Sequence, residues 1–146
     1  MSGREKRLLV LGTGAMARHH AERFAQMPGC QLVAAVDVSD ARARDFAAAF
    51  QIPTAFGSLA DAIAWGEFDA AVNSTPDGAH KETTLALIAA GKPVFCEKPL
   101  AIDYPDALAM TEAAEAAGVV NMVNLTYRNA AALQLARTMI EAGEIG

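Results

Sequence analysis

The stretch that decides the fold runs from residue 7 to residue 17 and reads RLLVLGTGAMA. Four of its first five residues, Leu8 to Leu11, are apolar and are followed by Gly12, which is typical of a strand covered on both faces. The next residues fit the motif G-x-G-x-x-A at a strand-to-helix junction. In this motif Gly12 allows a tight turn, Gly14 lets a pyrophosphate approach the backbone, and Ala17 lets the helix pack closely. We therefore expect a dinucleotide-binding turn made by Gly12, Thr13, Gly14, Ala15 and Met16.

Strand-like and helix-like segments alternate along the rest of the chain. We predict strands at 7–11, 32–36, 54–56, 70–73, 93–96 and 119–123, and helices at 15–27, 39–50, 58–65, 80–90 and 104–117. Because parallel strands need long crossovers, which helices supply, this order predicts an α/β fold with a doubly wound parallel sheet of Rossmann type. Residues 1–125 are expected to form this domain. Residues 126–146 read as a junction helix, from about 130 to 142, and the start of a second domain.

Asp37 follows the second predicted strand, where a carboxylate accepts hydrogen bonds from the adenosine ribose of a dinucleotide. The same carboxylate would repel a 2′-phosphate, so the sequence favours NAD over NADP. Arg42 and Arg44 keep NADP open as the less favoured cofactor. The alternative role for Asp37 is a cap on the next helix, which Ser39 or Asp40 can also provide.

Polar residues also follow two later strands, where open α/β sheets bind ligands. These segments are Asn73-Ser74-Thr75-Pro76 and Glu97-Lys98-Pro99. The simpler interpretation of Lys98 and Glu97 is a solvated surface ion pair, which contributes little to stability. Their position at a strand end, beside Pro99, favours a functional role.

At these residues the chain resembles the Gfo/Idh/MocA oxidoreductases. The resemblance covers nearly the whole chain and is carried by GTGAMA with His20, Thr75-Pro76 with His80, AAGKPV at 89–94 and CEKPLA at 96–101. It implies that Lys98 is catalytic, reaching substrate and nicotinamide, where an ammonium stabilises a developing alkoxide and helps relay the hydroxyl proton. It further implies a cofactor site that includes Ser74, Thr75, Pro76, His80, Glu97, Lys98 and Asn124, with Glu97 at the nicotinamide-side ribose.

His20 and His80 each have a second interpretation, as packing or capping residues rather than proton carriers. The resemblance also implies a second domain with a large open sheet, which supplies most of the substrate pocket and a further acid–base pair. That domain has no counterpart in these 146 residues. We therefore expect a cofactor domain, and the sequence leaves open whether it is active alone.

The resemblance predicts an NAD(P)-dependent dehydrogenase that transfers hydride between the nicotinamide and a sugar, cyclitol or related polyol. Two alternatives stay open at this point. One is a non-catalytic dinucleotide-binding module or sensor, favoured by the missing domain. The other is an NAD-dependent lyase or glycosidase of the same family.

Composition and sequence patterns exclude several classes of partner and site. Lys and Arg total 12 against 17 Asp and Glu, a net charge of -5 that argues against nucleic acid as a partner. The longest apolar runs are too short to span a membrane, which predicts a cytoplasmic protein. Cys30 and Cys96 are far apart, so neither a metal site nor a disulfide is expected. The apolar side chains of the last helix leave a homo-oligomer open.

Overall fold

A single parallel sheet forms the centre of the molecule. The computed structural model describes residues 4–145. The strands are β1 (Lys6–Leu11), β2 (Cys30–Val36), β3 (Thr54–Phe56), β4 (Ala70–Asn73), β5 (Val94–Cys96) and β6 (Asn121–Val123). They pair in the order β3-β2-β1-β4-β5-β6, and every pairing is parallel. The predicted doubly wound sheet is confirmed, and its strand order reverses between β1 and β4.

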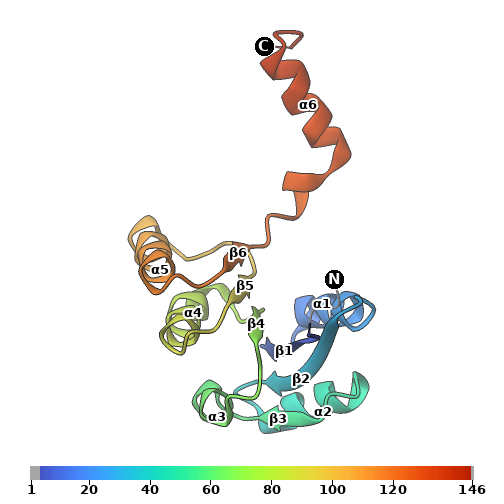
Figure 1. The fold of residues 1–146 in the computed structure, drawn as a ribbon, viewed down its shortest axis with the longest axis vertical. Helices are drawn as coiled ribbons and strands as arrows, with labels where there is room; N and C mark the ends of the chain where they lie inside the picture. Colours follow the sequence, from blue (N-terminus) through green and yellow to red (C-terminus); the bar gives the residue numbers. More distant parts are fainter. Residues whose placement is uncertain (1–3, 146) are drawn as a thin grey trace.

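Helices cover both faces of this sheet (Figure 1). The helices are α1 (Ala15–Ala25), α2 (Asp40–Ala49), α3 (Leu59–Trp65), α4 (His80–Ala89), α5 (Tyr104–Ala117) and α6 (Ala131–Glu141), with short 3-10 turns η1 (Asp77–Ala79) and η2 (Thr126–Asn129). Helices α1 and α2 lie on one face, and α3, α4 and α5 lie on the other. Each face has its own apolar core, centred on Val10 and Phe46 under α1 and α2 and on Leu9 and Leu87 on the other side.

Side chains next to the helices determine where several of them begin. Side-chain caps from Ser39, Ser58 and Asp103 accept backbone hydrogen bonds at the starts of α2, α3 and α5. The structure corrects some predicted limits. Helix α1 ends at Ala25 rather than residue 27, because the next two amides bond carbonyls three residues back in a tighter turn. Strand β2 begins at Cys30, two residues early, because Cys30 pairs with Lys6.

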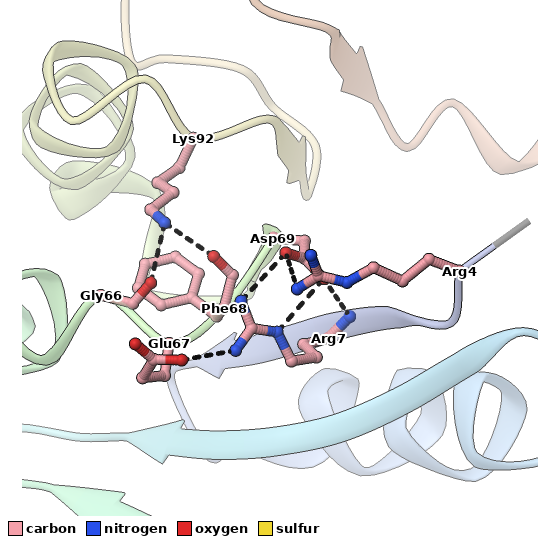
Figure 2. Close-up of polar contacts among 7 residues, drawn as sticks. All are labelled: Arg4, Arg7, Gly66, Glu67, Phe68, Asp69 and Lys92. Atoms are coloured by element: carbon pink, nitrogen blue, oxygen red, sulfur yellow. Dashed lines mark hydrogen bonds and ion pairs between the residues drawn. The ribbon is translucent and has the colours of Figure 1, made fainter.

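Charged side chains fasten the edge of the sheet where the strands begin, which we call the amino edge (Figure 2). The Arg7 amide and guanidinium both donate to the Asp69 carboxylate, at 2.8 Å from N to Oδ2 and 3.2 Å from Nη2 to Oδ1. Arg7 also contacts Glu67 at 2.7 Å, and Arg4 lies 3.6 Å from Asp69. These contacts attach the start of β1 to the loop before β4.

Lys92 closes the same loop from the other side (Figure 2). Its ammonium donates to the carbonyl oxygens of Gly66 at 3.0 Å and Phe68 at 2.7 Å. It also lies 4.4 Å from the centre of the buried Phe68 ring, a distance at which cation–π attraction operates. Lys92 therefore has a structural explanation at the edge opposite the candidate site.

Helix α6 extends away from the sheet beyond β6 (Figure 1). None of its residues is buried, and Leu133, Leu135 and Ile140 are each at least half exposed. An amphipathic helix in this position has an apolar face without a partner within residues 4–145. Over the same residues, no helix is long and apolar enough to cross a membrane.

Candidate cofactor site

Five of the predicted site residues lie in a row at the opposite edge of the sheet, the carboxyl edge. Each is the first residue after its strand, and each backbone amide donates to a carbonyl at the end of a neighbouring strand, at 2.8 to 3.2 Å. The sheet ladder thus continues one residue beyond the strands and holds this row in register. The residues, in chain order, are Gly12, Asp37, Ser74, Glu97 and Asn124.

The turn after β1 has room for a ligand at one glycine and none at the other. Gly12 has φ +80°, and a Cβ there would lie 2.6 Å from the carbonyl oxygen of Ser74. At Gly14, in contrast, a Cβ would meet nothing within 4 Å. Ala17 is fully buried, so α1 packs closely against the sheet. The space beside Gly14, at the start of α1, is therefore open, as an anion-binding helix terminus requires.

The Asp37 carboxylate is buried among hydrogen-bond donors. Oδ2 accepts from the Thr13 amide at 3.1 Å and the Thr13 hydroxyl at 2.7 Å. Oδ1 accepts from the Ser39 amide at 3.0 Å and from Arg42 Nη2 at 2.7 Å. Burial raises the pKa of Asp37, but the donors from Ser39, Thr13 and Arg42 together outweigh it, and the pKa is lowered. The carboxylate is therefore ionised at neutral pH.

Arg42 is the exposed partner in this group, since its side chain is 64% exposed while that of Asp37 is 8% exposed. Beside the pair lies a cleft of about 300 Å³. Its lining comes from the ends of β1 and β2 and from the segments after β3 and β4, and includes Gly12, Val38, Ser58, Pro76 and Ala79. This cleft lies near the carboxyl ends of β1 and β4, where the strand order of the sheet reverses. Open parallel sheets bind nucleotides at this position.

The segment after β4 is held by buried polar side chains. Asn73 is fully buried, and its oxygen accepts from the Thr75 amide and hydroxyl at 3.2 and 2.8 Å. The His80 ring is also fully buried, with Nδ1 2.7 Å from the Pro99 carbonyl oxygen and Nε2 2.9 Å from that of Thr75. We expected His80 to border the cofactor. The structure instead places it beneath two loops, with neither ring nitrogen free for a ligand.

Glu97 occupies a buried junction between three elements. Its Oε1 lies 2.6 Å from His20 Nε2 on α1 and 2.7 Å from Asn124 Nδ2 after β6. Its Oε2 accepts from the Lys98 amide at 3.1 Å. Burial raises the pKa of Glu97, but the bonds from Asn124, His20 and the Lys98 amide outweigh it, and the pKa is lowered. The surface ion pair considered for Glu97 and Lys98 is not formed, because Glu97 is buried among other partners.

Lys98 itself is exposed, and its peptide bond to Pro99 is cis. It borders a cleft of about 220 Å³ whose other walls are Leu125, Thr126, Tyr127 and Arg128. The predicted segments after β5 and β6 therefore meet at one cleft. Within residues 4–145, no three His, Cys, Asp or Glu side chains gather as metal ligands would.

These features fit a dinucleotide along the carboxyl edge. Gly14 leaves open the space that a diphosphate needs at the start of α1. The Ser74 hydroxyl is buried without a hydrogen-bond partner in the protein, next to the same turn. Sequence reasoning missed His20 as a partner of Glu97. The available signal was its position three residues after Ala17, which places both residues on the buried face of α1.

Comparison with known proteins identifies the family and the fold. Residues 6–125 match the GFO_IDH_MocA family, described as an oxidoreductase family with an NAD-binding Rossmann fold. The chain is 36% identical over 137 residues to 1,5-anhydro-D-fructose reductase of Ensifer adhaerens, covering 94% of this chain and 41% of that protein. It is 39% identical over 113 residues to an inositol 2-dehydrogenase of Rhodococcus erythropolis, covering 77% of this chain and 33% of that protein.

Solved structures agree. The WlbA dehydrogenase of Bordetella pertussis, in complex with NADH and UDP-GlcNAcA, has a TM-score of 0.92 and 33% identity, covering 100% of this chain and 42% of its own. An Agrobacterium radiobacter oxidoreductase, in complex with NAD+, L-tartaric acid and magnesium, has a TM-score of 0.88 and 27% identity, covering 97% of this chain and 42% of its own. The chain thus spans less than half the length of these relatives. It belongs to the GFO_IDH_MocA oxidoreductase family and has that family's NAD-binding Rossmann fold.

Proposed function

We propose that this chain is the cofactor domain of an NAD-dependent dehydrogenase acting on a sugar, cyclitol or related polyol. The observation that carries the proposal is the joint placement of Asp37, Gly14 and Lys98 along one edge of the sheet. Asp37 and the cleft beside it would hold the adenosine, and the start of α1 would hold the diphosphate. Lys98 and its cleft would then face the nicotinamide end.

The exposed Lys98 is the residue proposed to act on the substrate. Its ammonium would donate a hydrogen bond to the substrate oxygen and stabilise negative charge there as the alcohol becomes a carbonyl. The bound nicotinamide supplies the hydride acceptor. The protein contributes position and charge. The Lys98 amide donates to the Glu97 carboxylate, and the Glu97 amide donates to the Asn73 carbonyl, so the backbone at Lys98 is held against the sheet.

We propose NAD over NADP because the Asp37 carboxylate is ionised and would lie beside the adenosine ribose. A 2′-phosphate placed there would be repelled by the Asp37 carboxylate and attracted by the exposed Arg42 guanidinium. Arg42 offsets part of this repulsion, so the preference is a ratio of affinities rather than exclusion of NADP.

The test has two parts. Calorimetric titration of the 146-residue chain with NAD+, NADH and NADPH should show binding, tighter for the NAD forms. A panel of cyclitols and sugars should then be assayed for NADH formation, by the chain alone and by any longer form that carries the second domain. In the active form, Lys98→Gln should lower turnover far more than cofactor affinity.

Three outcomes would change the proposal. Absence of binding to every nicotinamide cofactor would contradict it. Turnover unaffected by Lys98→Gln would remove Lys98 from the reaction. Tight binding without turnover in any form of the protein would favour a binding module or sensor instead.

A further inference from the structure

One buried polar junction is not explained by the dinucleotide-binding motif. It joins His20 on α1, Glu97 after β5 and Asn124 after β6. The side chains of His20 and Glu97 are only 9% and 6% exposed. Buried polar groups of this kind are costly unless they are fully bonded. The junction therefore connects the helix that begins at the diphosphate turn with the loop that carries Lys98.

Counting hydrogen-bond donors fixes the role of each atom. The lowered pKa of Glu97 leaves its carboxylate ionised at neutral pH, and an ionised carboxylate only accepts. The hydrogen between His20 and Glu97 must then lie on His20 Nε2. Oε1 receives two donors, from His20 and Asn124, while Oε2 receives one, from the Lys98 amide. A carboxylate has about four acceptor positions, so one acceptor position on Oε2 is left over.

The core fixes the direction of the His20 ring. The ring packs edge-on against Phe95 of β5, with centroids 5.3 Å apart and planes at 85°. Phe24, one turn further along α1, lies 6.3 Å from the same ring. Because aromatic packing restricts the ring, Nε2 points at Glu97 as a consequence of how α1 lies on the sheet. His20 is thus attached to the core on one side and to the site on the other.

We propose that His20 is a positioning residue for the nicotinamide half of the cofactor site. With Asn124, it holds Oε1 of Glu97 turned into the protein. Oε2 then keeps two tasks: it holds the Lys98 amide, and its remaining acceptor position receives a hydroxyl of the ribose nearest the nicotinamide. This inference rests on the proposed cofactor site, and it assigns to that site a residue that lies outside the ligand's reach.

The experiment compares ligands that contain or lack the second ribose. Calorimetry on the 146-residue chain would use NAD+, ADP-ribose and ADP, of which only ADP lacks that ribose. His20→Phe keeps an aromatic ring between Phe24 and Phe95 but removes the donor. His20→Gln keeps a donor at the position of Nε2. His19→Phe is the matched control, since His19 is the exposed neighbour on the same helix.

His20→Phe should lower the affinity for NAD+ and for ADP-ribose by about fivefold, equivalent to about 1 kcal/mol for one hydrogen bond. The affinity for ADP should not change. His20→Gln should restore most of the loss, and His19→Phe should behave as the wild type. Asn124→Leu removes the other donor to Oε1 and should reproduce the selective loss. It serves as the second variant if His20→Phe does not fold.

Equal weakening of ADP and NAD+ in the folded His20→Phe variant would overturn the proposal, because it would show only a general disturbance of α1. Unchanged NAD+ affinity, or failure of Gln to restore it, would also overturn it. These results differ from failure of the proposed function, in which the wild-type chain would bind neither ADP nor NAD+. That outcome would remove both conclusions.

Discussion

The two glycines of the turn after β1 should respond to alanine in opposite ways. Gly12→Ala would place a Cβ 2.6 Å from the Ser74 carbonyl oxygen, 2.8 Å from its carbon and 2.9 Å from the Thr75 nitrogen. These are backbone atoms, held by the hydrogen bond between the Ser74 amide and the Leu11 carbonyl. The substitution also forces a side chain into a left-handed conformation, at φ +80°. Gly12→Ala should therefore destabilise the fold.

The size of the effect follows from these two terms. The left-handed conformation costs about 1 to 2 kcal/mol, and overpacking against fixed atoms adds about 1 to 3 kcal/mol. Gly29→Ala isolates the first term, because Gly29 has φ +82° and a Cβ there meets nothing within 4 Å. We expect Gly12→Ala to lower the free energy of unfolding by roughly 2 to 5 kcal/mol and Gly29→Ala by about 1 to 2 kcal/mol.

Gly14→Ala should leave stability nearly unchanged, within about 0.5 kcal/mol, since its Cβ would enter open space at an ordinary φ of -75°. The same Cβ would occupy the space proposed for the diphosphate, so NAD+ affinity should fall. Urea unfolding followed by fluorescence of the single tryptophan, Trp65, gives the stabilities, and calorimetry gives the affinities. A wild-type free energy of unfolding in Gly12→Ala would refute this reasoning. So would a loss of stability in Gly14→Ala as large as the loss expected for Gly12→Ala.

Three further predictions concern single side chains. Asp37→Ala should weaken NAD+ more than NADP+ in calorimetric titrations, and equal losses would argue against the ribose role. Hydrogen bonds from Arg7 lower the pKa of Asp69 from 3.8 to about 2, so its contribution to stability is complete above pH 4 and is lost as the pH falls toward 2. Asp69→Asn should flatten the dependence of unfolding free energy on pH over that interval, and an unchanged slope would contradict it. Burial raises the pKa of the Cys96 thiol to about 11, so a thiol reagent should modify Cys96 only after unfolding. Because Cys30 is also free and only partly buried, the label is located by peptide mapping; rapid labelling at Cys96 in the folded chain would contradict the prediction.

Local patterns in the sequence were sufficient to predict the fold and to propose part of the candidate site. The alternation of short apolar runs with capped helices depends on neighbours within a few residues, and it predicted six parallel strands. Gly12, Gly14 and Ala17 lie within one turn and the start of one helix, so their spacing alone predicted a dinucleotide-binding turn. Asp37 followed from its place at a strand end. Helix and strand limits were less accurate, as at α1 and β2, because they depend on pairing with distant residues.

Only the tertiary structure decided which polar groups meet. His20 and Glu97 are 77 residues apart, and Asn124 lies another 27 residues along the chain. They meet because the sheet places β5 between β4 and β6, and because His20 of α1 packs against Phe95 of β5. No short sequence window contains this arrangement. The same holds for Thr13, which lies 24 residues from Asp37, and for His80, whose ring bonds the Pro99 carbonyl 19 residues away. A sequence records which side chains can donate or accept, but their partners depend on strand order and packing, which the whole chain determines together.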